Sequence, residues 1–502
     1  MISARYNMWG FLLGLMLLVS GCGKSVSVPL SGVADSAEAP SIYPDYTSLV
    51  FPPNIAPLNF EIKSPGEEFV AELKASDGSS IAASGKTVQW DMDEWRDFIG
   101  KNAGNDVTLN VYVKNGAGVW TRYSSTSRVA PDSIDSHFSY RLIEPSYTMY
   151  GLLTINQRDL TSFDESVIFN NTYNRDETRG FCINCHVPRN QYQDKKSQFH
   201  VRQFNGGTLI MDGSEVRKVN LKTDSTISAG VYQAWHPTAE NLIAYSVNDT
   251  HQQFFLKDKQ KIEVLDSSSD VILYDLDANE VSSVSNDTTL LETFPAWSPE
   301  GDRLFYSVAR YPEGTTSKNV EMKFDEIRYD IVSRRFDIAT KSFSAPDTVV
   351  YASGRSRSAL LPRVSPDGRY LLFCEADHGT FHIWHKDSDL FVADLTTGEI
   401  IPLDQANSDD VDSYHSWSSN GRWIIFSSRR DDGSYTRPYI TYFSPEGKAS
   451  KAFVVPQEDP AYYQRLMKSY NVPEFMVSAV EPTRADILKA LESEATPVTY
   501  RP

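Results

Sequence analysis

Four segments of the sequence repeat one pattern, in which a short apolar stretch leads through a turn into a second apolar run. They are AWHPTAENLIAYS from Ala234, AWSPEGDRLFYS from Ala296, RVSPDGRYLLF from Arg363 and SWSSNGRWIIFSS from Ser416. Proline presets φ at the second position of a tight turn, and glycine accepts positive φ at a later one. Each segment therefore predicts a strand, a turn and a second strand.

A second hairpin follows in the intervals between these segments, as VILYDLDANEVSSV, RRFDIATKSF and DLFVADLTTGEIIPL. Units of four strands that recur at intervals of tens of residues are typical of β-propeller blades. The intervals between Trp235, Trp297, Val364 and Trp417 are 62, 67 and 53 residues, which indicates inserted loops or degenerate blades between the clear ones. We expect an all-β chain with a propeller of five or six blades over residues 206–470.

The strings SPDGRYLLF and DLFVADLTTGE resemble the repeats of the TolB-type β-propeller family, and the resemblance covers about half of the chain. Two positions depart from the pattern. Ala239 stands where the other repeats have glycine, so its turn must take a different form, and Ser419 replaces the proline.

The N-terminus has the features of an export signal. Residues 8–19 form an uncharged apolar run that is too short to span a bilayer but suits a signal-peptide core. The following Val-Ser-Gly-Cys22 resembles a bacterial lipobox, although an ordinary signal with a chance cysteine is the alternative. We expect removal of residues 1–21, lipidation of Cys22 and a flexible tether over 22–44. No acidic run follows Cys22, which favours the periplasmic face of the outer membrane.

Residues 45–140 carry strand signals, and apolar residues alternate at period two in VTLNVYVKNG. An antiparallel sheet with one apolar face needs a second layer, so we expect an immunoglobulin-like β-sandwich. At the other end, residues 471–502 form a C-terminal segment in which Ile487, Leu488 and Leu491 predict a short amphipathic helix.

Composition and absent motifs exclude several function classes. There are 48 Lys and Arg against 66 Asp and Glu, and this net charge of −18 argues against a nucleic-acid partner. Four cysteines in 502 residues cannot build a disulfide framework. No G-x-S-x-G occurs, so a propeller-capped serine hydrolase is not expected and we predict no catalytic residues.

The motif with the clearest chemistry is GFCINCHVPRN, which contains Cys182, Cys185 and His186. C-x-x-C-H is the attachment pattern of c-type haem, in which one helical turn brings both thiols to the porphyrin vinyl groups and the imidazole to the iron. Asn, Arg and Pro in the flanks predict an irregular haem-binding segment over 141–205. A zinc site would need further ligands, a thiol-redox pair would need a βαβ context, and a local disulfide or chance match is the remaining alternative.

The nearest candidate for the second axial ligand of the iron is His200, in SQFHVRQFNGGT. Here the chain resembles lipoproteins of Bacteroidetes that join the haem motif to a TolB-type propeller; FPPNIAPLNFEI, SYRLIEPSY and SYNVPEF extend the resemblance over most of the mature chain. His236, His415 and Met211 are alternatives, and the position can also be open. Arg202 is either a partner of a haem propionate or a surface arginine.

Two other groups of residues suggest metal binding only at first reading. His378, His382 and His385 lie between two predicted strands, and strand spacing would put His382 and His385 on opposite faces unless a loop gathers them. The segment YDLDANE lacks the ligand spacing and central glycine of a calcium loop, which indicates a polar hairpin tip.

The sequence thus predicts a membrane-anchored, extracytoplasmic protein with one covalently attached haem c. It would serve electron transfer or redox sensing, with the propeller as a docking platform for a redox or envelope protein partner. The alternative is a TolB-like binding or scaffold lipoprotein with a structural haem or none. A haem peroxidase is third, because dihaem peroxidases carry two attachment motifs and this chain has one.

Overall fold

The computed structural model describes residues 26–144, 152–176, 178–256, 262–285 and 287–502. The apolar run 8–19 and Cys22 lie outside the described residues, so their predicted roles stay predictions. Within the described ranges, no helix is both long enough and apolar enough to cross a membrane.

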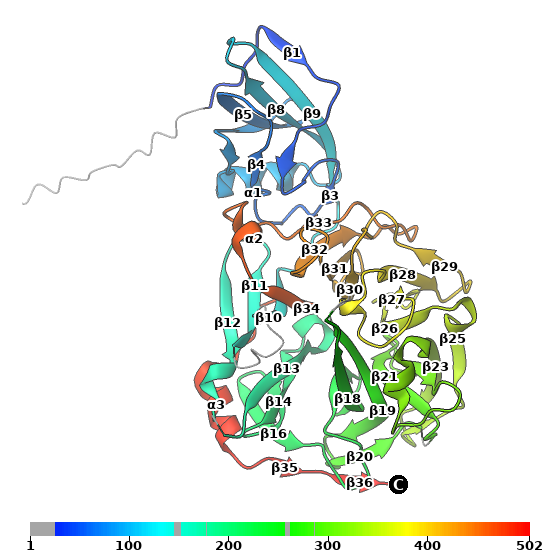
Figure 1. The fold of residues 1–502 in the computed structure, drawn as a ribbon. Helices are drawn as coiled ribbons and strands as arrows, with labels where there is room; N and C mark the ends of the chain where they lie inside the picture. Colours follow the sequence, from blue (N-terminus) through cyan, green and yellow to red (C-terminus); the bar gives the residue numbers. More distant parts are fainter. Residues whose placement is uncertain (1–25, 145–151, 177, 257–261, 286) are drawn as a thin grey trace, which may run out of the picture.

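The first domain consists of two β-sheets and one helix, and it sits at one end of the molecule (Figure 1). The larger sheet contains β1 (Val33–Asp35), β9 (Trp120–Val129), β8 (Asp106–Lys114), β5 (Glu68–Ala75), β6 (Ser80–Ser84) and β3 (Val50–Phe51). The smaller sheet contains β2 (Ile42–Tyr43), β4 (Phe60–Ile62) and β7 (Thr87–Val88).

The residues expected to alternate in β8 behave as predicted, because Val107, Leu109, Val111 and Val113 are all buried. Helix α1 (Met92–Lys101) closes one end of the domain, with the side chain of Asp91 accepting hydrogen bonds from the first turn. It buries Trp95, Phe98 and Ile99. The two sheets agree with the expected layered domain, while its immunoglobulin-like type stays a prediction.

The rest of the described chain forms six sheets of four or five strands, arranged as blades around a common centre (Figure 1). Blade 1 contains β34 (Ser469–Met476), β10 (His137–Ile143), β11 (Leu153–Asp159) and β12 (Glu165–Asn170). Blade 2 contains β13 (Phe181–Pro188), β14 (Lys196–Gln203), β15 (Gly207–Asp212) and β16 (Glu215–Asn220). Blade 3 contains β17 (Val231–Trp235), β18 (Leu242–Phe254), β19 (Ile262–Asp275) and β20 (Glu280–Ser283).

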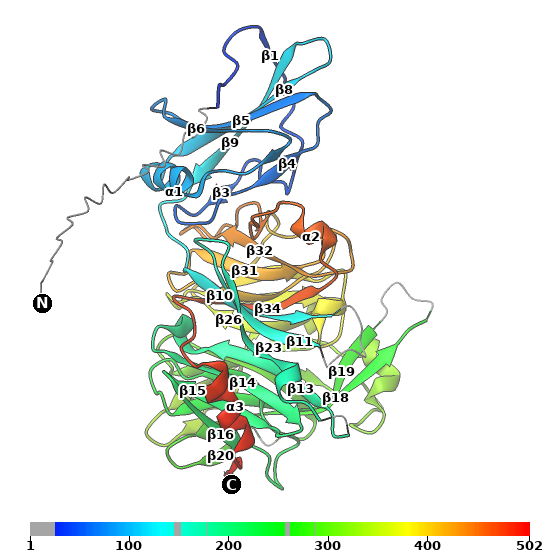
Figure 2. The same ribbon diagram turned by 90° about the vertical axis from the view of Figure 1, so that its left-hand side faces the viewer.

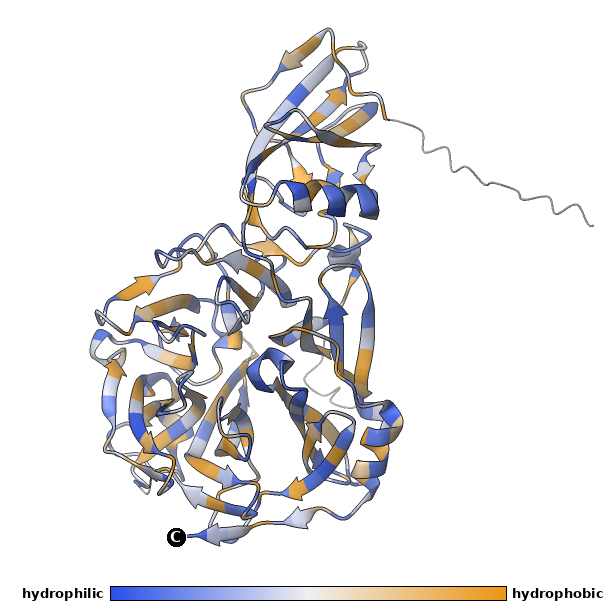
Figure 3. Cartoon of the chain, turned by 180° about the vertical axis from the view of Figure 1, so that it is seen from behind, coloured by the Kyte–Doolittle hydropathy of each residue, from blue (hydrophilic) through white to orange (hydrophobic). Residues whose placement is uncertain are grey.

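Blade 4 contains β21 (Leu290–Trp297), β22 (Arg303–Arg310), β23 (Tyr329–Asp337) and β24 (Ser342–Phe343), and β25 (Asp347–Val350) also pairs with β23. Blade 5 contains β26 (Ser358–Val364), β27 (Tyr370–Ala376), β28 (Asp389–Asp394) and β29 (Ile400–Pro402). Blade 6 contains β30 (Asp412–Trp417), β31 (Trp423–Ser428), β32 (Arg437–Tyr442) and β33 (Phe453–Val454). Hydrophobic residues gather in the blade strands (Figure 3), and the expected β-propeller is therefore present.

The propeller begins earlier than the sequence indicated. Residues 141–205, expected to be irregular, instead supply strands of blade 1 and the first two strands of blade 2. The Asn, Arg and Pro residues around the motif do not predict strands. The strands of a blade are covered on both faces by the neighbouring blades, so they need no regular alternation of apolar and polar residues.

The C-terminal segment completes the ring instead of standing apart from it. Strand β34 pairs antiparallel with β10, from Met476 opposite His137 to Ser469 opposite Ile143. The predicted helix is present as α3 (Arg484–Glu492), with Ile487 and Leu491 buried against blade 2. Beyond it, β35 (Thr496–Pro497) joins the edge of blade 2 and β36 (Thr499–Arg501) joins the edge of blade 3.

The first domain packs on blade 6 and on the short helix α2 (Tyr462–Arg465) near it (Figure 2). Asp132 links the two parts, because its carbonyl accepts from Trp423 Nε1 at 3.2 Å and its carboxylate accepts from Tyr442 OH at 2.7 Å. Ser419, the residue that replaces the repeat proline, donates its backbone N–H to Asp135 at 2.7 Å. The departure from the repeat pattern thus serves the contact between the domains.

The turn at Ala239 takes the different form that the sequence predicted. His236 Nδ1 accepts from the backbone N–H of Ala239 at 2.9 Å, and His236 Nε2 lies 2.9 Å from the carbonyl oxygen of Gly301 in the next blade. Gly301 has φ of 77°, and a Cβ there would collide with the His236 ring. The histidine therefore joins two blades at a point where glycine is required.

Candidate functional site: the central cavity

The innermost strand of every blade is interrupted at the same place. Its pairing with the neighbouring strand shifts register there, and one residue takes a left-handed conformation with φ between 48° and 59°. These bulge residues are Cys185, Tyr232, Phe294, Leu361, Tyr414 and Val472. A bulge re-aims side chains, and all six of these residues line one cavity at the centre of the ring.

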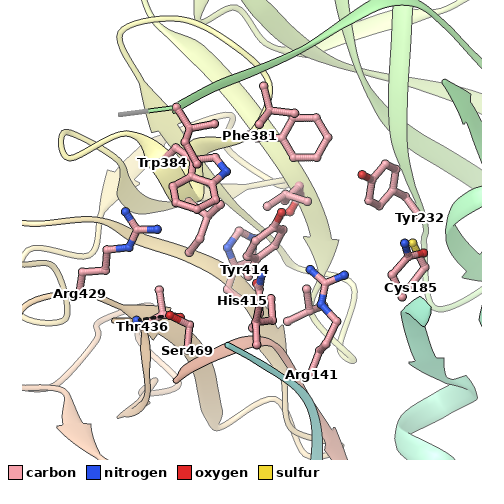
Figure 4. Close-up of a pocket in the computed structure, with 18 of the residues that line it drawn as sticks. Arg141, Cys185, Tyr232, Phe381, Trp384, Tyr414, His415, Arg429, Thr436 and Ser469 are labelled. Atoms are coloured by element: carbon pink, nitrogen blue, oxygen red, sulfur yellow. Dashed lines mark hydrogen bonds between the residues drawn. The ribbon is translucent and has the colours of Figure 1, made fainter. Parts of the chain in front are cut away.

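The cavity has a volume of about 1130 Å³ and lies where the inner strands meet (Figure 4). Its wall carries aromatic side chains and charged side chains of both signs. Besides the bulge residues, the aromatic residues on it include Phe381, Trp384 and Tyr435, and the arginines are Arg141, Arg202, Arg363 and Arg429. Pockets of about 300–1,000 Å³ usually hold drug-sized ligands, so this cavity has room for a large planar one.

The three motif residues Cys182, Cys185 and His186 lie together on this wall. They belong to strand β13, so the helical turn expected for the motif is absent. Residues three apart on a regular strand face opposite ways, and the bulge at Cys185 changes that alternation. Ile183 between the thiols is fully buried in the core of blade 2.

The two thiols have different surroundings. Cys182 pairs across the ladder with Arg202, which also lines the cavity. Cys185 sits beside Tyr232 (Figure 4), and burial raises the pKa of its thiol, while the charge of Arg202 acts in the opposite direction. The carbonyl of Cys185 accepts a hydrogen bond from Gln233 Nε2 in blade 3. The Cys185 sulfur is thus a protonated thiol near neutral pH, with a cation close by.

His186 is 4% exposed, and its Nε2 has no hydrogen-bond partner among the described residues. Burial lowers the pKa of its imidazole to about 4, and the charge of Arg141 acts in the same direction. The ring is therefore neutral at physiological pH, which is the form that binds metal ions.

A comparison of blades gives His186 a second possible role. The residue after the bulge is Gln233 in blade 3 and His415 in blade 6, and each bonds to the bulge carbonyl of the preceding blade. Gln233 bonds to that of Cys185, and His415 Nε2 lies 2.8 Å from that of Leu361. His186 occupies the same position, beside the backbone of Val472 in blade 1. Side chains here can therefore join neighbouring blades.

The structure does not bring His200 to the cavity. His200 lies on β14 opposite Asn184, is buried, and has its Nδ1 3.2 Å from Thr208 Oγ1. Met211 lies in the core of blade 2, and His236 is used in the turn described above. Among the described residues, His186 and His415 are the histidines that line the cavity. Burial lowers the pKa of His415 to about 3, and its Nδ1 has no hydrogen-bond partner there.

Several cavity residues were not found by sequence reasoning, notably Arg141, Tyr232 and Tyr414. These residues lie within β10, β17 and β30, beside the register shifts of those strands. No local pattern in the sequence marks these shifts. Asp275, in contrast, behaves as predicted for a hairpin tip, because its carboxylate accepts from the backbone N–H of Asp277 at 3.1 Å and pairs with Lys341.

The three histidines near residue 380 do not lie on a strand. The loop between β27 and β28 contains the short 3₁₀ helix η5 (His382–Trp384), and the rings of His382 and His385 are 5.5 Å apart. Strand alternation therefore does not separate them, and the loop gathers them as the alternative interpretation allowed.

No protein-family model and no curated protein matches the chain. Among solved structures, it is similar to TolB from Acinetobacter baumannii, with 11% identity, a TM-score of 0.41, and coverage of 77% of this chain and 85% of that one. A hypothetical selenium-binding protein from Sulfolobus tokodaii has 7% identity and a TM-score of 0.37, with 70% and 96% covered. An oligogalacturonate lyase in complex with manganese has 12% identity and a TM-score of 0.30, with 82% and 99% covered. The propeller assignment rests on the chain's own six sheets.

Proposed function

We propose that this protein is an extracytoplasmic, membrane-anchored haem protein whose propeller holds one haem c in its central cavity. The observation that carries the proposal is that Cys182, Cys185 and His186 line one large cavity together. In this proposal the protein carries electrons or senses redox state, and the propeller is the surface on which a protein partner docks.

The two thiols would attach the porphyrin. Each thiol adds across one vinyl C=C bond, so that a C–S bond forms, the double bond becomes single and the thiol proton moves to carbon. The addition needs no oxidant. The addition requires reduced cysteines, and Cys182 and Cys185 are both free.

The polar groups of the wall fit the rest of the cofactor. His186 is a neutral imidazole whose Nε2 has no hydrogen-bond partner among the described residues, which suits it to bind the iron, and His415 is the candidate for the opposite side in place of His200. Arg141 and Arg202 are suited to pair with the propionates, while Tyr232, Phe294 and Tyr414 offer apolar contact. The bound haem would supply a one-electron couple whose potential depends on its axial ligands and burial.

The proposal also covers the types of the two domains and the membrane anchor. We assign the propeller to the TolB-like type and the first domain to the immunoglobulin-like sandwiches. Cys22 would carry the lipid that holds the protein on the periplasmic face of the outer membrane. Replacing Cys22 by Ser should move the protein from the membrane to the soluble fraction, and unchanged fractionation would contradict the anchor.

The haem is tested by producing the full chain together with a cytochrome c maturation system and recording the pyridine haemochrome spectrum. Covalent haem should survive denaturation in the wild type and in Cys374→Ser, a control that removes a buried thiol from blade 5. The double variant Cys182→Ser, Cys185→Ser should carry none. Wild-type protein that is folded but free of covalent haem would overturn the proposal.

The second candidate is a haem-free binding scaffold, and one observation favours it. His186 stands where Gln233 and His415 bond to neighbouring blades, so the histidine of the motif has a purely structural equivalent. In that case the cavity would take an apolar ligand with an anionic group, facing the aromatic residues and arginines. A folded, haem-free wild type would support this second function.

A further inference from the structure

A group of metal-binding side chains lies outside the motif and just behind the cavity wall. Ile262 and Val264 on β19 line the cavity, so Glu263 between them points to the other face of the strand. There it meets His378 and His385 from the loop between β27 and β28. Their donor atoms, one from each residue, all lie within 4.8 Å of one another.

The geometry of this group is that of ligands arranged around a common point. His385 Nε2 lies 3.1 Å and His378 Nε2 lies 3.7 Å from the same oxygen, Oε2 of Glu263. Among the described residues, the two Nε2 atoms make no contact with a hydrogen-bonding group closer than this carboxylate. Glu263 and His385 are 0% and 1% exposed, and His378 is 19% exposed. A buried carboxylate on which two imidazole nitrogens converge is an arrangement that can hold a cation.

The loop backbone closes tightly around the group at one glycine. Gly379 has φ of 82°, and a Cβ there would lie 2.9 Å from Glu263 Oε1 and 3.0 Å from His385 Cε1. The glycine is fixed in place because its N–H donates to the carbonyl of Ile327 at 3.0 Å and its carbonyl accepts from Ser358 Oγ at 2.8 Å. The loop is thus held in position before any ion binds.

The surrounding side chains form an aromatic and neutral shell. The ring of Phe324 is 5.7 Å from that of His378, and the rings of His378 and His385 are 4.7 Å apart. His382 lies behind His385, with its Nδ1 3.5 Å from Cys374 Sγ. It is not one of the three residues whose donor atoms converge.

We propose that Glu263, His378 and His385 bind one divalent transition-metal ion, of which zinc is the best fit. Two imidazoles and one carboxylate are a common protein ligand set for such ions, with a further position left for water. This site is separate from the haem motif and does not depend on the proposed function.

The position of the site suggests what the ion does. Glu263 belongs to blade 3 and the histidines belong to blade 5, so the ion would join two blades that are not neighbours in the ring, across blade 4. The same loop carries Phe381 and Trp384 on the cavity wall. The ion would therefore fix that part of the wall and stabilise the propeller.

The test measures zinc and iron separately in the full-length chain by elemental analysis after dialysis against metal-free buffer and reloading with zinc. We expect one zinc per chain and a higher melting temperature. Cobalt(II), used as a probe in place of zinc, should give a visible absorption band. The double variant Cys182→Ser, Cys185→Ser should retain this zinc, which distinguishes the site from zinc bound at the haem motif.

Glu263→Gln keeps the volume of the side chain and should lower zinc affinity by more than about 100-fold, since a ligand matters at least as much as the groups that orient it. His385→Ala should do the same. His251→Ala removes an exposed histidine of blade 3 and is the matched control, with zinc retained. If circular dichroism shows that a variant does not fold, the zinc content of the wild type still tests the proposal. No stoichiometric zinc in the wild type, or full affinity in Glu263→Gln, would overturn the proposal.

Discussion

Strands β13 of blade 2 and β30 of blade 6 have the same backbone and different chemistry. Both bulge at one residue with positive φ, both place a histidine directly after it, and both lie on the cavity wall. They differ at two equivalent positions. The bulge residue is Cys185 in β13 and Tyr414 in β30, and the residue three positions earlier is Cys182 in one case and Val411 in the other. The propeller thus supplies the position, and two thiols decide what that position can do.

The largest effect is expected when β13 is given the side chains of β30. The double variant Cys182→Val, Cys185→Tyr should abolish covalent haem completely, because no thiol remains to form a thioether. The fold should persist, since a tyrosine already occupies the equivalent bulge. Haemochrome spectra and circular dichroism measure the two effects, and haem that remained covalently bound would refute the assignment of these thiols.

The next variant separates the two roles of the histidine. His186→Gln installs the residue that blade 3 uses at this position, and it keeps a side chain able to bond across blades. If His186 binds iron, the Soret band and the reduction potential should shift while the haem-free protein keeps its stability to within about 1 kcal/mol. His415→Gln is the matched variant in blade 6. An unchanged spectrum in His186→Gln would leave only the structural role.

A smaller effect should follow at the junction of blades 3 and 4. Gly301→Ala places a Cβ against the His236 ring at a residue with positive φ. It should lower the free energy of unfolding by about 2 kcal/mol or more, which urea denaturation measures. Ala239→Gly in the preceding turn is the control and should change it by less than about 1 kcal/mol. Equal effects would show that the turn glycine is not required there.

The smallest effect depends on pH and concerns β21, which carries a buried acid where β13 carries its motif. Burial raises the pKa of Glu292 to about 7 from an ordinary 4.5, with Asp270 adding to the rise. The folded state thus holds the proton more tightly. Stability from this group is complete below pH 4.5 and is lost as pH rises through about 7.

Glu292→Gln should therefore raise the free energy of unfolding at pH 8 by about 1–3 kcal/mol, with little change at pH 4. Urea titrations at the two pH values measure the difference. The same gain at both pH values would mean that the carboxyl does not titrate as inferred.

The repeats with strong turn signals were predictable from the sequence, and blade 1 was not. The strands that contain Trp235, Trp297 and Trp417 could be predicted because turns with proline or glycine follow these residues at a fixed spacing. Strand β10 and strand β34 come from opposite ends of the chain, so no local pattern pairs them. Helix α3 was predictable because its three apolar residues suffice to define one face.

The site was predictable in part and for similar reasons. The spacing within Cys182, Cys185 and His186 is local and can be read directly, although its strand conformation cannot. The ligand group behind the wall depends on Glu263, which is more than 100 residues from His378 in the sequence. Only the ring of blades brings them together, so the histidines alone did not predict a metal site.

Closure of the ring by β34 sets an order of events during folding. Blade 2, with Cys182 and Cys185, is built from consecutive strands, whereas the inner strand of blade 1 is Ser469–Met476 from the C-terminal part of the chain. Until that last inner strand docks on β10, the ring has an open side next to blade 2. The haem that we propose would reach the thiols laterally through that gap, and docking of β34 would then enclose it.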